Sequence, residues 1–140
     1  MKPDTGSDVV DAILHAAHRV RTGADARLRE RGLSLPSYKL LKALAQADLS
    51  MREASQALHL SPRTVTDMID SLEARGLVTR TPHPTDRRVT LLHLTPPGAR
   101  QLADAAVGAD QARAAAISAL SADDRRTLRT LLDKVGAPPA

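Results

Sequence analysis

The residues best suited to recognise another molecule lie between positions 61 and 88. Residues 61–75 read S-P-R-T-V-T-D-M-I-D-S-L-E-A-R, and residues 81–88 read T-P-H-P-T-D-R-R. Hydroxyl and guanidinium groups donate hydrogen bonds to phosphates and base edges, which is the chemistry of DNA recognition. A helix that carries the first set can enter a major groove, while a hairpin that carries the arginines reaches the adjacent backbone or minor groove.

Residues 61–75 carry the local signals of a helix. Ser61 is placed to cap the first turn, and Pro62 suits the first helical position because its missing N–H costs nothing there. Apolar residues recur at i, i+3, i+4 and i+7 and predict one stripe facing a core: Val65, Met68, Ile69 and Leu72. Gly76 favours a left-handed stop. An ordinary amphipathic surface helix has the same pattern, so this helix alone does not establish DNA binding.

A hairpin is predicted after this helix. Residues 77–80 and 89–94 have strand character, and the loop between them contains two prolines. Asp86 can pair with either Arg87 or Arg88 and fix its direction, which leaves the other arginine free. The alternative is a solvated hairpin in which Asp86 and Arg88 form a weak surface ion pair.

The rest of the chain is predicted to be helical, apart from a single bridging strand at 48–50. The expected helices cover 7–31, 34–47, 50–58, 95–119 and 121–135, and each begins at a serine or threonine: Ser7, Ser34, Ser50, Thr95 and Ser121. Glu53 completes a capping box with Ser50. The two helices at 50–58 and 61–75, joined by a short turn, form a helix-turn-helix whose second helix is the reader.

We therefore expect a mainly α fold with a small β-wing. The expected segments are an N-terminal dimerisation helix (1–32), a winged helix-turn-helix DNA-binding domain (33–95), C-terminal dimerisation helices (96–136) and a tail (137–140). Within the DNA-binding domain, the reader helix spans 61–75 and the wing spans 77–94. The terminal helices carry more apolar surface than a small winged unit can cover, so we expect a second copy of the chain as partner.

Composition excludes several other classes of function. The 140 residues include one Tyr, no Phe and no Trp, which argues against base stacking on aromatic platforms. The absence of Cys excludes disulfides, thiolate metal sites and cysteine-based redox sensing. The net charge of +4 is spread thinly, so individual arginines have to carry any DNA binding. We expect a cytoplasmic protein without a membrane partner, since no signal peptide or membrane-spanning run is visible. The sequence shows no Gly-rich phosphate loop and no group of catalytic residues, which argues against an enzyme.

Three stretches together resemble the MarR family of transcriptional regulators. They are S-P-R-T-V-T-D-M-I-D-S-L-E-A-R-G-L-V-T-R at 61–80, D-R-R at 86–88 and L-H-L-T-P-P-G at 92–98. Their order and spacing match the family's reader, wing and post-wing signatures. The resemblance implies an obligate dimer of winged helix-turn-helix subunits that binds a palindromic operator, usually as a repressor. It also implies that a small molecule commonly relieves binding.

The resemblance assigns roles to individual residues. Those expected to contact DNA are Ser61, Arg63, Thr64, Thr66, Asp67, Arg87 and Arg88, with Arg87 near the minor groove. Asp86 and Arg88 match the pair that shapes the wing. Asp67 departs from the pattern because a neutral or basic residue would suit a DNA-facing position better. We expect it to pair with Arg63; the alternative is that it accepts from a cytosine amino group. His83 stands where many relatives carry an acidic residue.

A ligand site is implied between the first two helices. His15, His18, Arg19 and Tyr38 are the candidates to bind a small anionic aromatic or phenolic effector, and the alternative is that they are packing or interface residues. His15 and His18 lie three apart on a helix, which leaves a zinc-responsive regulator of the same fold as a second possibility. We expect no cofactor and no metal site. A helical interaction module without DNA binding is the third possibility, and the intact D-R-R and reader face argue against it.

Overall fold

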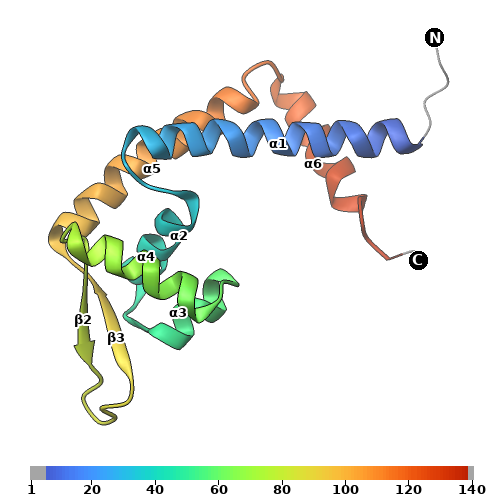
Figure 1. Ribbon diagram of the computed structural model, residues 1–140. Coiled ribbons are helices and arrows are strands. Elements are labelled where there is room, and N and C mark those ends of the chain that lie inside the picture. Colours follow the sequence, from blue (N-terminus) through green and yellow to red (C-terminus); the bar gives the residue numbers. More distant parts are fainter. Residues whose placement is uncertain (1–5, 139–140) are drawn as a thin grey trace.

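The structure is a computed structural model that describes residues 6–138. Its elements in chain order are α1 (Gly6–Glu30), α2 (Leu35–Gln46), β1 (Leu49–Ser50), α3 (Met51–Leu58), α4 (Pro62–Ala74), β2 (Val78–Pro82), β3 (Thr90–Leu94), α5 (Pro96–Ala116) and α6 (Ala122–Lys134). The long helices α1 and α5 pack along each other, and α2, α3, α4 and the hairpin form a compact unit at one end (Figure 1). The predicted mainly helical fold with a β-wing is confirmed. The predictions for 139–140 of the tail lie outside the described residues.

Side-chain caps account for most helix starts. The side-chain oxygen of each cap accepts from the backbone N–H three residues on, as the sequence predicts, at Ser34, Ser50, Ser61, Thr95 and Ser121. The side chain of Glu53 accepts from the backbone N–H of Ser50, which completes the capping box. The prediction that Ser7 caps α1 is wrong, because α1 already begins at Gly6 and includes Ser7. Helix α5 ends three residues earlier than expected, where the backbone of Ile117 leaves helical geometry.

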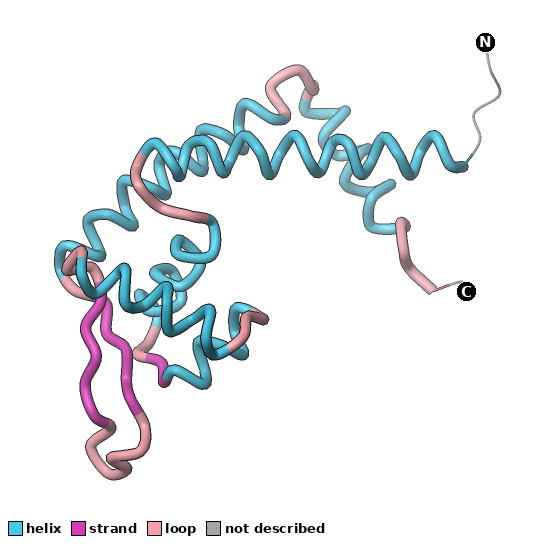
Figure 2. Tube along the Cα trace, in the orientation of Figure 1, coloured by secondary structure: helices cyan, strands magenta, loops and turns pink. Residues whose placement is uncertain are grey.

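The sheet has three antiparallel strands in the order β1-β3-β2 (Figure 2). Leu49 pairs with Leu92, and Val78 pairs with Leu94, so β3 is central. The predicted bridging strand therefore exists, and it joins the base of the hairpin to the link between α2 and α3. Beyond this base the hairpin extends away from the helices and ends in the loop that carries the two arginines.

The core is aliphatic and lies where α2, α4, β3 and the facing ends of α1 and α5 meet. Its fully buried large side chains are Leu28, Leu33, Leu40, Leu41, Val65, Ile69, Leu72, Val78 and Leu92. The single tyrosine, Tyr38, joins this core at 7% exposure, and the ammonium of Lys42 stands 5.3 Å from its ring centroid. The predicted apolar stripe of α4 thus faces the core, with Met68 half-buried at its edge.

Helices α1 and α4 end in the same left-handed motif. Gly32 and Gly76 both have φ of 74°. The N–H of Leu33 donates to the carbonyl of Leu28, and the N–H of Leu77 donates to the carbonyl of Leu72, each at 3.0 Å. Each bond runs from the residue after the glycine back to the last turn of the helix, and a pair of buried leucines lies at each stop. Both glycines are therefore required by backbone geometry.

A large apolar surface remains uncovered on the terminal helices. Helix α6 has no buried residue, and the first half of α1 has only half-buried and exposed side chains. The exposed apolar side chains include Val9, Val10, Leu14, Leu128, Leu131, Leu132 and Val135. Single exposed leucines are ordinary, but a clustered set indicates an interaction surface. None of the helices in residues 6–138 is long and apolar enough to cross a membrane.

Candidate nucleic-acid interface

The first turn of α4 presents a compact set of polar groups. The hydroxyl of Ser61 accepts from the backbone N–H of Thr64 at 3.1 Å and lies 2.8 Å from the Thr64 hydroxyl. The Thr66 hydroxyl donates back to the carbonyl of Pro62 at 2.9 Å. Arg63 is exposed between them. One O–H of the Ser61–Thr64 pair stays free to donate, at the positive end of the helix where an anion is favoured.

The expected pairing of Arg63 with Asp67 is wrong, since no ion pair in residues 6–138 joins them. The order of the charges explains this result. A basic residue placed four positions before an acidic one is the weaker orientation on a helix. Asp67 lies instead beside a hollow that it shares with Ser37 of α2 and Ser71 of α4.

Arg80 of β2 binds the acidic face of α4, and the sequence did not single it out. Its guanidinium donates to the carboxylate of Asp70 and lies 3.8 Å from that of Glu73. Its backbone N–H donates to the other oxygen of Glu73 at 3.2 Å. Arg80 therefore joins the wing to the reader helix and offsets two of its negative charges. The spacing of Asp70 and Glu73 and the alternation along the strand were the only signals of this contact in the sequence. Their partner lies on the strand after the turn, so these signals did not identify it.

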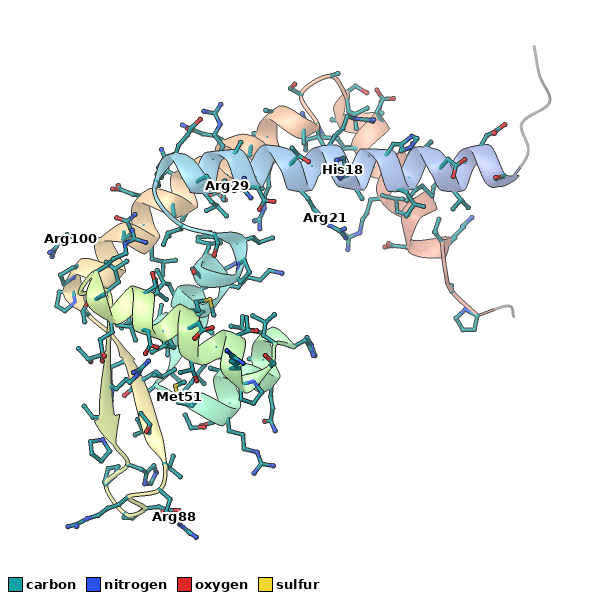
Figure 3. All side chains as sticks on the ribbon, in the orientation of Figure 1. His18, Arg21, Arg29, Met51, Arg88 and Arg100 are labelled. Carbon is teal, nitrogen blue, oxygen red and sulfur yellow. The ribbon has the colours of Figure 1, made fainter. Side chains whose placement is uncertain are left out.

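Asp86 and Arg88 make the predicted pair at the end of the wing loop. The backbone N–H and Nε of Arg88 donate to Oδ1 of Asp86, both at 3.1 Å, and Nη2 donates to Oδ2 at 3.3 Å. The Arg88 guanidinium, and secondly its backbone N–H, hold the pKa of Asp86 below its ordinary value. Arg88 still projects at the hairpin tip (Figure 3). Arg87 is exposed, and no hydrogen bond or ion pair within 6–138 engages it.

His83 also orders the wing loop. Its ring Nδ1 accepts from the backbone N–H of Thr85 at 3.2 Å. The backbone N–H of His83 donates to the carbonyl of Val89 at 2.9 Å, and the backbone N–H of Val89 donates to the carbonyl of Asp86 at 3.0 Å. These bonds close the loop on itself, so the two arginines extend from a defined turn.

Arg52 of α3 is a second residue that the sequence did not single out. It is exposed and lines two hollows. Pro62 and Thr66 of the reader line the first hollow, and Arg88 and Thr90 of the wing line the second. Arg52 therefore stands between the reader and the wing. Its place one residue after the start of a capped helix was the only signal, and the sequence offered no reason to connect it with the hairpin.

The histidines are dispersed over the fold. Nδ1 of His93 lies 2.8 Å from Oδ2 of Asp48, and its Nε2 lies 2.5 Å from the hydroxyl of Thr81, so this ring joins β2 and β3 to the residue just before β1. His59 ends α3 with a left-handed backbone. Within residues 6–138, no three His, Asp or Glu side chains gather as a metal-ligand set.

The candidate effector residues fall into two environments. His15, His18 and Arg19 are exposed on α1, with His18 well away from the reader unit in Figure 3. Arg19 lines a hollow between α1 and α5 together with Arg27 and small residues of α5. Tyr38 is buried in the core. An effector site that includes all four residues remains a prediction.

This chain is similar in sequence and in fold to known proteins. The MarR family model matches residues 31–89, which include the reader and most of the wing. The uncharacterised HTH-type transcriptional regulator YsmB of Bacillus subtilis is 30% identical over 95 residues, which cover 67% of this chain and 65% of that protein. The matched region thus spans slightly less than two thirds of that relative.

Solved structures extend the similarity over almost the whole chain. Wild-type MarR of E. coli in its apo form aligns with a TM-score of 0.77 at 25% identity, covering 91% of this chain and 96% of that one. The transcriptional repressor CouR, bound to a 23-mer DNA duplex, aligns with a TM-score of 0.76 at 27% identity and covers 90% of each chain. These relatives are named as regulators and not as enzymes. The chain belongs to the MarR family of transcriptional regulators.

Proposed function

We propose that this protein is a sequence-specific DNA-binding regulator that recognises a palindromic operator as a homodimer. The observation that carries the proposal is the position of Arg52. The hollows on its two sides join the start of the reader helix to the wing in one strip. Arg52 and Arg88 line these hollows, and Arg63 is exposed on the residue next to Pro62, so α3, the wing and the reader each supply an exposed cation. CouR, a relative of the same fold, has been solved on a DNA duplex, which supports this use of the surface.

Each part of the strip suits a different part of the duplex. The first turn of α4 carries Ser61, Arg63 and Thr64 and fits the major groove, where side chains distinguish base pairs. Arg87 at the wing fits the minor groove, where negative potential attracts arginine. The backbone that separates the two grooves would then pass Arg52, whose guanidinium suits a phosphate.

The dimer would form through the terminal helices. The apolar side chains of α1 and α6 left exposed in one chain are the surfaces we assign to the partner copy. In this division α1, α5 and α6 serve dimerisation, and residues 33–95 bind DNA. Two readers related by a two-fold axis would meet half-sites about 34 Å apart. Acting on chromosomal DNA, such a regulator would reside in the cytoplasm.

We further propose that the protein is a repressor released by a small anionic aromatic or phenolic molecule. Arg19 and Arg27 at the hollow between α1 and α5 supply positive charge near His18 on the same helix. A ligand held there would act at the dimerisation helices rather than at the reader. Thermal-shift screening of phenolic and aromatic acids would detect it. His18→Ala should reduce the shift, whereas Tyr38→Phe, whose ring is buried in the core and does not line this hollow, is the control. No shift with any such acid would reject this class of effector.

The DNA proposal is tested by selecting duplexes from a random library with the full chain. We expect an inverted repeat with two equal half-sites. Arg63→Ala or Thr64→Ala should relax the base preference within each half-site, by roughly 1–3 kcal/mol per lost bidentate contact. Selection without any enriched sequence would reject sequence-specific binding. A chain that sediments as a monomer at micromolar concentration would reject the dimer.

A further inference from the structure

The C-terminal end of the reader helix meets the ends of the dimerisation helices α1 and α5 at a small junction. Helix α4 packs chiefly on α3 and β2 and does not lie along α1 (Figure 1). Arg75, the C-terminal cap of α4, reaches the turn that follows α1. Nη1 of Arg75 donates to the carbonyl oxygen of Gly32 at 2.6 Å. This bond joins residues that are 43 positions apart in the sequence.

The acceptor is an end of a helix. Gly32 is the left-handed residue that stops α1, and the carbonyls at such a stop have no partner within their own helix. The carbonyls of the last turn of α1, just before Gly32, carry the negative end of the helix dipole, so a cation beside them is favoured. Arg75 therefore occupies a position at the end of α1 that suits a charged, forked donor better than it suits a neutral side chain.

A second donor holds the same turn from the opposite side. The side-chain amide of Gln101, on α5, donates to the carbonyl of Arg31. The Arg31 guanidinium in turn lies over Gly108, where an added Cβ would come within 2.6 Å of its Nη1. Two neighbouring carbonyls at the end of α1 are thus bound by the reader helix and by α5.

Because the apolar stripe of α4 is buried in the core, a change at the Arg75–Gly32 contact would tilt α4 together with the unit it packs in, relative to α1. Arg75 is followed directly by the left-handed Gly76, whose carbonyl accepts from the hydroxyl of Thr95 at 2.6 Å. The reading end of α4 lies at the far end of its 13 residues, about 20 Å away at 1.5 Å per residue. A tilt of about 5° at Arg75 would move that end by roughly 1.7 Å. In a symmetric dimer the two shifts add to roughly 3.4 Å, the rise of one base pair.

We propose that Arg75 is a positioning residue that sets the spacing between the two readers, so that it determines which operator spacing is accepted without touching DNA. The inference rests on the proposed DNA-binding function. It requires Arg75 to affect the distance between half-sites and to leave the base preference within a half-site unchanged.

The experiment uses the full-length chain and the duplex selected by the wild-type protein. Fluorescence anisotropy would measure affinity for this duplex and for versions with one or two base pairs inserted or deleted at its centre. We expect wild type to lose at least about tenfold in affinity for a one-base-pair change, since each poorly placed half-site loses its base contacts. Arg75→Met, which keeps the apolar stem, should reduce that loss to about threefold or less. Arg75→Lys, which retains a donor cation, should restore part of the wild-type preference for the original spacing.

Arg100→Met is the matched control, because Arg100 is an exposed arginine of α5 that projects away from the reader unit (Figure 3). It should keep the wild-type spacing profile. If Arg75→Met weakens binding equally at every spacing, or keeps the wild-type preference, the inference is overturned. If wild type selects no operator at all, the proposed function fails instead, so the two failures are distinguishable.

Discussion

Asp86 holds Arg88 through three hydrogen bonds, while the adjacent Arg87 stays exposed without a bonded partner in the described chain. One arginine thus shapes the loop and its neighbour remains available for a duplex. The carboxylate must be ionised to accept all three bonds. The wing should consequently respond to protonation of a single side chain.

The pH dependence of the wing follows from Asp86. Because Arg88 lowers its pKa in the folded chain, the bonds are fully present above the pKa of the unfolded chain, about 4, and they are lost as the pH falls through the lower folded value. The Nε–H and backbone N–H resonances of Arg88 should shift together in that acidic range. In Asp86→Asn the shift should be absent. A pH-dependent shift of these Arg88 resonances in that variant would show that another group is responsible.

Arg87 should contribute an electrostatic contact to DNA. Arg87→Ala is expected to weaken operator binding and to flatten its dependence on salt. If each of the two wings neutralises one phosphate charge, the slope of log affinity against log salt should fall by about two per dimer. Anisotropy titrations between low and moderate salt would measure the slope. Arg100→Ala should leave the slope unchanged. An unchanged slope in Arg87→Ala would show that Arg87 does not contact DNA.

Arg52 should bind the backbone without reading sequence. Arg52→Ala is therefore expected to weaken operator and unrelated duplexes by a similar factor and to reduce the salt slope, unlike Arg63→Ala. Competition between the operator and random duplex would separate the two effects. A variant that lost affinity for the operator alone would assign Arg52 to base recognition.

Gly98 and Gly23 form a matched pair for stability. A Cβ at Gly98, in the first turn of α5, would overlap the carbonyl of Leu77 at the base of the wing, whereas a Cβ at Gly23 would meet nothing within 4 Å. Gly98→Ala should thus cost about 1–3 kcal/mol through overpacking. Gly23→Ala should stabilise α1 by about 0.5–1 kcal/mol. Urea unfolding of both variants would measure the difference, and equal midpoints would contradict the close packing at Gly98.

Short-range rules predicted most of the fold. The caps at Ser50 and Ser61 and the stop at Gly76 depend on residues within a few positions, so the sequence determines them locally. With Ser7 as the cap, α1 would begin at Asp8; it begins two residues earlier at Gly6, within the usual disagreement about helix ends.

Contacts across the fold could not be predicted in this way. Arg80 reaches Asp70 only because β2 folds back along α4, and Arg75 reaches Gly32 only once α1 and α4 are both in place. Periodicity identifies which face of an element is apolar, but it does not identify which polar side chain of another element lies opposite. The polar groups that connect the reader to its surroundings therefore required the structure.

The burial of Tyr38 beneath Lys42 has a spectroscopic consequence, because this ring is the chain's only aromatic side chain apart from histidine. Without tryptophan, the protein is nearly dark at the wavelengths that excite phenolic compounds with extended conjugation. Its weak tyrosine emission comes from one site in the centre of the core. A fluorescent ligand or a labelled duplex can thus be followed with almost no background, while the same sample reports through Tyr38 whether the core has opened.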